Sequence, residues 1–166
     1  RSLMAKNKEE KTNVMRVLEQ KKIAYTAHTY PHEEGMAVDG VTVAKSMGFD
    51  PAIVFKTLVA RGASKQYYVF DVPVAENLDL KKAAKAVGEK SIEMIHQKEL
   101  LPLTGYVHGG CSPVGMKKLF PTVFHSSAEN LAAMIVSAGK IGYQVELAPH
   151  DLAALVRAKF ADIIVE

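Results

Sequence analysis

The segment IVFKTLVARGASKQYYVFDV, residues 53–72, is the part of the sequence from which the fold can be inferred most directly. Its two ends, residues 53–60 and 67–72, are rich in β-branched and aromatic side chains, which predicts two strands. The glycine-containing turn at residues 61–64 predicts that the second strand returns along the first as a hairpin. Both faces of the first strand are largely apolar, so we expect this strand to lie inside a sheet.

Helices and further short strands are expected on either side of this hairpin. Helices are predicted at residues 12–22, 41–47 and 80–87, and from residue 149 to about 159. A short helical turn is also predicted to follow residue 95 and to end at Pro102. Strands are predicted at residues 23–30, 91–95, 106–108, 122–125, 134–137, 143–147 and 163–165. Because the strands are short and mostly linked by hairpins, with helices between them, the sequence favours an α+β fold with a mixed, partly closed sheet over a doubly wound parallel one.

The composition indicates one globular domain without disulfide bonds. The chain has 166 residues, of which 48% are hydrophobic and 23% charged, enough to build a sizeable core. Cys111 is the single cysteine, which excludes an internal disulfide and suits a cytoplasmic location. We expect residues 1–10 to be an N-terminal extension, partly a remnant of expression because Arg1 precedes the first methionine, and residues 11–166 to form the domain. No apolar run has the length of a membrane span.

Lysine is the main source of the modest net charge of +3. This excess permits a nucleic-acid partner without demanding one. Lysines gather at residues 6–11, 21–22, 81–85 and 117–118. A single cluster of this kind is more typical of a solvated helix face, whereas several clusters on one side would form a surface for tRNA.

Lys56 is the first candidate for a functional side chain because it lies within the apolar strand at residues 53–60. An ammonium group in such a run needs an anion or a strong acceptor, or its pKa falls. Periodicity alone supports two interpretations equally. One is a binding or catalytic lysine, and the other is a lysine on an edge strand whose ammonium group reaches water.

The second candidate is the glycine-rich loop GGCSPVG at residues 109–115, which Lys117 and Lys118 follow closely. Its glycines allow close backbone approach, so its N–H groups can face an ester carbonyl as negative charge develops on oxygen. A tight turn between strands is the structural alternative. Ser112 has no Gly-x-Ser-x-Gly surroundings, so we expect a hydroxyl that lines a pocket rather than a hydrolase nucleophile. Since the six histidines are scattered, we also expect Cys111 not to act as a nucleophile.

In this order, Phe-Lys-Thr-Leu at residues 55–58 and Gly-Gly-x-Ser-Pro-x-Gly about fifty residues later resemble the YbaK/EbsC family of freestanding aminoacyl-tRNA deacylases. The resemblance extends from about Lys11 to the C-terminus and implies a β-barrel-like sheet surrounded by helices. It also implies that Lys56 is catalytic. Substrate-binding roles are implied for Tyr30, Lys56, Thr57, Gly109, Gly110, Ser112, Pro113, Gly115 and Asp151. Many relatives carry an aromatic residue in the loop before Gly40, where this chain has Val38 and Asp39.

Members of this family release cysteine from mischarged Cys-tRNA(Pro), and the resemblance implies that the substrate thiol attacks its own ester. Release of alanine from Ala-tRNA(Pro), as in a sister branch, and a non-catalytic module that binds tRNA or a nucleotide are the alternatives. The implied partners are charged tRNA(Pro) and prolyl-tRNA synthetase. The histidines lack the spacing of a metal site, so we expect no metal, no cofactor and no membrane contact.

Overall fold

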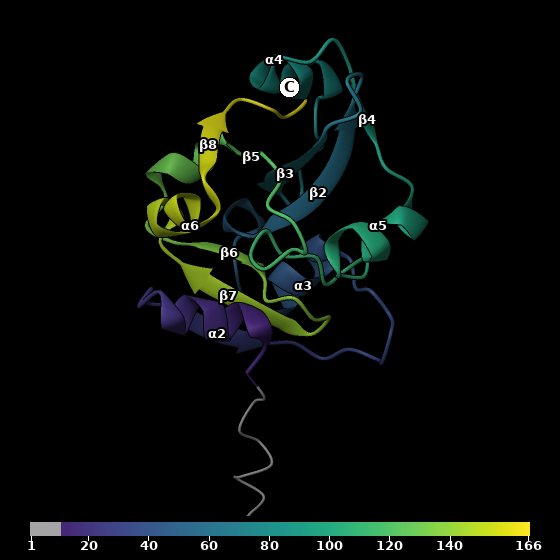
Figure 1. Ribbon diagram of the computed structural model, residues 1–166. Coiled ribbons are helices and arrows are strands. Elements are labelled where there is room, and N and C mark those ends of the chain that lie inside the picture. The colour runs from purple at the N-terminus through teal and green to yellow at the C-terminus, as the bar shows by residue number, and fades with distance from the viewer. Residues whose placement is uncertain (1–10) are drawn as a thin grey trace, which may run out of the picture.

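The computed structural model describes residues 11–166, and the expected N-terminal extension at residues 1–10 lies outside them. Within the described chain, five α-helices surround two β-sheets (Figure 1). The helices are α2 (Asn13–Gln20), α3 (Gly40–Ser46), α4 (Leu80–Val87), α5 (Gln97–Thr104) and α6 (Pro149–Val156). The prediction of an α+β fold is therefore confirmed.

The larger sheet is built on the predicted hairpin. Strands β2 (Phe55–Gly62) and β3 (Tyr67–Pro73) pair antiparallel, with Thr57 opposite Asp71. The sheet order is β4-β2-β3-β5-β8, where the added strands are β4 (Ile92–Met94), β5 (Thr122–His125) and β8 (Ala158–Ala161). Strand β5 runs parallel to both β3 and β8, so the sheet is mixed, as predicted.

The smaller sheet has three antiparallel strands in the order β1-β7-β6. They are β1 (Thr26–Thr29), β6 (Met134–Ser137) and β7 (Tyr143–Leu147). The two sheets meet at one parallel bridge between Val54, just before β2, and Ile135 in β6. The strands thus form two joined sheets instead of the one partly closed, barrel-like sheet that was expected.

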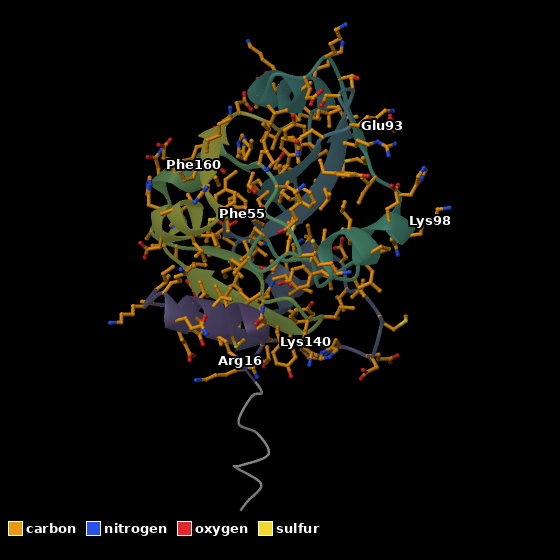
Figure 2. All side chains as sticks on the ribbon, viewed as in Figure 1. Arg16, Phe55, Glu93, Lys98, Lys140 and Phe160 are labelled. Carbon is orange, nitrogen blue, oxygen red and sulfur yellow. The ribbon has the colours of Figure 1, made fainter. Side chains whose placement is uncertain are left out.

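Two layers of side chains cover the larger sheet. On one face, Ala83 and Ala84 of α4 pack against Phe70 and Val72. On the other face, α5 and the glycine-rich loop cover Val59 and Val69. The main core lies elsewhere, where α2 and α6 pack against the smaller sheet, and Phe55 reaches it from β2 (Figure 2). Since β2 contributes side chains to all of these layers, its position is fixed on both faces.

Some predicted elements differ from those in the structure. Residues 106–108 form an irregular segment rather than a strand. Pro102 does not end the helical turn, because α5 continues to Thr104. Two hydrogen bonds complete its last turn: Thr104 Oγ1 donates to Leu100 O (2.7 Å), and Gly105 N donates to Leu101 O (2.9 Å).

The last helix and the closing strand also differ from the prediction. Helix α6 ends at Val156 because Arg157 adopts a left-handed conformation with φ of 58°, so the closing strand is β8. Residues 163–165 contribute only an isolated bridge from Ile164 to Leu78.

Candidate active site

A cavity of about 360 Å³ lies along the edge of β2 that faces away from β3. Strand β4 pairs with β2 only at Ala60–Gly62, and the smaller sheet pairs with this part of the chain through one bridge at Val54, just before β2. Ile95 N donates to Val59 O (3.4 Å) on this outer edge, whereas Val74 N donates to Val54 O (2.8 Å) on the edge toward β3. Because backbone groups alternate along a strand, the N–H and C=O of Thr57 point to the outer edge and the cavity.

The strand edge divides the cavity into two sides, because Lys56 and Thr57 lie on opposite faces of β2 and both line it. Lys56 is partly buried. Burial lowers the pKa of its ammonium group, and the charges of Asp39 and Glu76 oppose that effect. Within residues 11–166, no side-chain hydrogen bond or ion pair engages Lys56 Nζ. The lysine therefore presents a partly desolvated cation to the cavity.

The Thr57 side chain is hydrogen-bonded to the buried carboxyl group of Asp71, a residue that was not predicted to belong to the site. Thr57 Oγ1 donates to Asp71 Oδ2 at 2.6 Å, across the β2–β3 pair. Asp71 is fully buried, and its Oδ1 has no hydrogen-bond partner in the described chain. Burial raises the pKa of Asp71 to about 7, although the hydrogen bond from Thr57 acts in the opposite direction. The available signal was one acidic residue inside the apolar run Tyr67–Pro73.

Only the first glycine of the glycine-rich loop lines the cavity. Gly109 has φ of +90°, and a Cβ there would lie 2.7 Å from Ala37 Cβ. Glycine is thus required for both conformation and space. A Cβ on Gly110 would come within 3.0 Å of Ile141 N, so this glycine packs against the β6–β7 connection.

The rest of the loop is a packed structural segment. Ser112 is fully buried, and its Oγ accepts a hydrogen bond from Val114 N at 3.2 Å. Tyr106 Oη donates to Val114 O at 2.5 Å, and a Cβ on Gly115 would lie 2.9 Å from that hydroxyl. Pro113 and Gly115 line a second, smaller cavity of about 130 Å³.

The structure therefore brings together four of the predicted site residues, Tyr30, Lys56, Thr57 and Gly109. It places Gly110, Ser112, Pro113 and Gly115 outside the lining of that cavity. Asp151 is exposed in the first turn of α6 and does not line it either. The substrate-binding roles of all these residues stay predictions.

The thiol of Cys111 lines the cavity but is not activated. Burial is the main cause that raises its pKa to about 12, and the nearby charge of Asp71 acts in the same direction. A thiol with this pKa stays protonated at neutral pH, and the thiolate is the nucleophilic form. This supports the prediction that Cys111 is not a nucleophile.

The departure from the family pattern at Val38 and Asp39 falls on the cavity wall. Asp39 is the N-cap of α3, where one carboxylate oxygen accepts hydrogen bonds from Thr42 N and Thr42 Oγ1, both at 3.1 Å. It therefore combines a capping role with a negative charge that acts on Lys56.

The smaller sheet forms another part of the cavity wall, and none of its lining residues was predicted from the sequence. Ser137, Tyr143 and Gln144 line the cavity from β6 and β7. Gln144 is buried, and its Oε1 has no hydrogen-bond partner in the described chain. These side chains come from predicted strands, but no local pattern marks which strand residues will face a cavity.

Within residues 11–166, no three His, Cys, Asp or Glu side chains gather as metal ligands would. No helix in that range is long and apolar enough to span a membrane.

Comparison with known proteins adds to this geometry. The family model for the aminoacyl-tRNA editing domain matches residues 32–155, which include Lys56, Thr57, Asp71 and the glycine-rich loop. A relative from Enterococcus faecalis, EbsC, bears the name of a Cys-tRNA(Pro)/Cys-tRNA(Cys) deacylase. The two sequences are 46% identical over 161 residues, 96% of this chain and 98% of the relative.

Two solved structures share the fold. One is described as a trans-editing enzyme for prolyl-tRNA synthetase; it has a TM-score of 0.78 at 24% identity, and the match covers 95% of this chain and all of that one. The other is a hypothetical protein with a TM-score of 0.81 at 18% identity, covering 92% of this chain and 99% of that one. From the family match and the relative at 46% identity, the chain belongs to the aminoacyl-tRNA editing domain family.

Proposed function

We propose that this editing domain is a trans-editing deacylase that releases cysteine from mischarged Cys-tRNA(Pro). The observation that carries the proposal is a cavity that holds a partly desolvated cation, Lys56, beside a cysteine that is not activated. Cys111 stays protonated and Ser112 is buried in the loop. A substrate that brings its own thiol does not need a nucleophile from the protein.

The proposed reaction is an intramolecular transfer. The cysteinyl sulfur attacks its own ester carbonyl carbon, and the bond from that carbon to the ribose 3′-oxygen breaks. The thiol proton ends on the 3′-oxygen, so the products are free tRNA and a cysteine thiolactone, which water hydrolyses later. The cavity contributes by confining the aminoacyl end, since proximity and orientation alone can supply several kcal/mol.

Lys56 would act on the oxygens of this substrate. Its ammonium group can bind the terminal phosphate of tRNA or stabilise the negative charge that develops on the ester oxygen. Such electrostatic stabilisation is strong in a site from which water is largely excluded. The partial burial that lowers the pKa of Lys56 reflects this desolvation.

Two alternatives use the same cavity. Release of alanine would need an external nucleophile, because an alanyl group has no thiol. A non-catalytic module would bind the charged end without cleaving the ester. The name of the relative at 46% identity favours cysteine over both. Prolyl-tRNA synthetase is proposed as a partner and the cytoplasm as the location, because both follow from this substrate.

The test is deacylation of Cys-, Ala- and Pro-tRNA(Pro) by the wild-type protein, by Lys56→Ala and by Lys85→Ala. Lys85 is a matched control because it is an exposed lysine of α4 that does not line the cavity. We expect rapid loss of cysteine only, abolished by Lys56→Ala and retained by Lys85→Ala. Release of alanine at a comparable rate would indicate the sister specificity, and binding without release would indicate the non-catalytic module.

A further inference from the structure

The hydrogen bond between Thr57 and Asp71 affects which chemical groups the cavity can bind. Asp71 lies in β3 at the centre of the larger sheet, with β2 on one side and β5 on the other. In the described chain its carboxyl group has one hydrogen-bond partner, the Thr57 hydroxyl, at 2.6 Å. A buried carboxyl group with one unpartnered oxygen costs stability, so packing alone does not account for it.

The pair determines which hydrogen-bonding role Thr57 can offer to a ligand. A threonine hydroxyl has one hydrogen and two lone pairs, and an ionised carboxylate can only accept. While the Thr57 hydrogen is donated to Asp71 Oδ2, Thr57 Oγ1 can act only as an acceptor toward the cavity. In its ionised form, which is well populated at and above a pH of about 7, Asp71 also adds negative charge behind this oxygen in a region of low dielectric.

The two sides of the cavity therefore have opposite character. Lys56 offers a cation on one face of β2, and Thr57 offers an acceptor with a carboxylate behind it on the other. A ligand that suits both sides carries an anionic or ester oxygen at one end and a cationic donor at the other. An α-aminoacyl ester has this combination on adjacent carbon atoms, as an ester group and an α-ammonium group.

We propose that Thr57 Oγ1 binds the α-ammonium group of the aminoacyl ester, and that Asp71 is the positioning residue that holds this hydroxyl as an acceptor. The inference rests on the proposed function, whose substrate it describes in more detail. The Cys111 thiol, which lines the same cavity, stays protonated and adds no charge of its own.

The test compares two stable ligands that differ only in the α-amino group. One is 3′-amino-3′-deoxyadenosine acylated with cysteine through an amide, and the other is the same nucleoside acylated with 3-mercaptopropionic acid. Calorimetry gives the ratio of their dissociation constants for each protein variant. We expect the wild-type protein to bind the cysteinyl ligand about 10- to 100-fold more tightly, as for a hydrogen bond to a charged group.

The variants separate positioning from general damage. Thr57→Val and Asp71→Val should bring the ratio close to one while the affinity for the mercaptopropionyl ligand stays unchanged. Asp71→Asn keeps an acceptor for the Thr57 hydroxyl but loses the charge, so its ratio should be intermediate. Glu93→Gln, which removes an exposed carboxylate from β4 at the outer rim of the molecule (Figure 2), should keep the wild-type ratio.

Several outcomes would overturn the proposal. One is a wild-type protein that binds both ligands equally or neither of them, and another is an unchanged ratio in Thr57→Val. If only Gln144→Met lowers the ratio, the ammonium group binds at the unpartnered Gln144 Oε1 instead. If Asp71→Val does not fold, the ratios measured for Thr57→Val and Asp71→Asn still test the proposal. Failure of the proposed function can be distinguished from failure of this inference. A protein that shows the expected binding ratios but no deacylase activity still contains the binding site for the α-ammonium group.

Discussion

The two segments that the sequence marks as functional, β2 and the glycine-rich loop, differ in how they contribute to the cavity. Strand β2 and the residue just before it supply five consecutive lining residues, from Val54 to Leu58, on both faces and along one edge. The loop at residues 109–115 supplies only Gly109 and Cys111, and its remaining residues support packing. A strand with an unpaired edge can expose successive residues to a ligand, whereas a tight loop uses most of its residues to hold its own shape.

The largest expected effect tests the β2 side of this comparison. Lys56→Met removes the cation but keeps a long apolar side chain, so deacylation of Cys-tRNA(Pro) should fall by about 10²- to 10³-fold. The melting temperature should not fall, because the variant no longer keeps a charge in a partly desolvated position. Initial rates and a thermal melt measure both quantities. A loss below tenfold would mean that Lys56 does not stabilise the reacting oxygens.

The second prediction concerns the stability cost of Asp71 in β3. Its pKa is raised from 3.8 to about 7 in the folded protein. Between these values the unfolded chain releases a proton that the folded chain keeps, so stability falls as the pH rises from about 4 to about 7 and this loss then levels off. The contribution amounts to about 4 kcal/mol in total.

Urea unfolding of the wild-type protein and Asp71→Asn at about pH 5 and about pH 8 measures this difference. The variant should gain stability relative to the wild type as the pH rises, because the asparagine does not ionise. Other titrating groups cancel in the comparison, which leaves the pH dependence of Asp71 alone. A constant difference between the two proteins would show that the pKa of Asp71 is ordinary.

A pair of glycine variants compares the two ends of the loop. Gly109→Ala places a methyl group against Ala37 in the cavity wall, so we expect about a tenfold loss of kcat/KM. Gly115→Ala places it against the Tyr106 hydroxyl instead, so we expect a loss of about 1–3 kcal/mol in stability with little change in rate per folded molecule. Equal effects of both variants on the rate would mean that the loop acts as one functional unit.

Local patterns predicted the hairpin, most of the helices and the mixed sheet, because these depend on alternation and on residues near in sequence. Thr12 and Asp79, just at the start of two predicted helices, cap α2 and α4. The resemblance selected Tyr30, Lys56, Thr57 and Gly109, which the structure does bring together. Asp71 and Gln144 could not be found in this way, because their roles depend on pairing between distant strands and on which strand edge stays open.

The smallest expected effect concerns Cys111, the second residue of the glycine-rich loop that lines the cavity. Cys111→Ala removes one buried sulfur atom, so stability should fall by about 1 kcal/mol. Deacylation of Cys-tRNA(Pro) should stay within about threefold of the wild type, because a thiol with a pKa of about 12 supplies almost no thiolate at neutral pH. The matched measurement is alkylation of the native protein by iodoacetamide, which should be slow until the chain unfolds. Fast alkylation together with complete loss of deacylation would make Cys111 the nucleophile, and the thiol of the substrate would no longer be needed to explain the reaction.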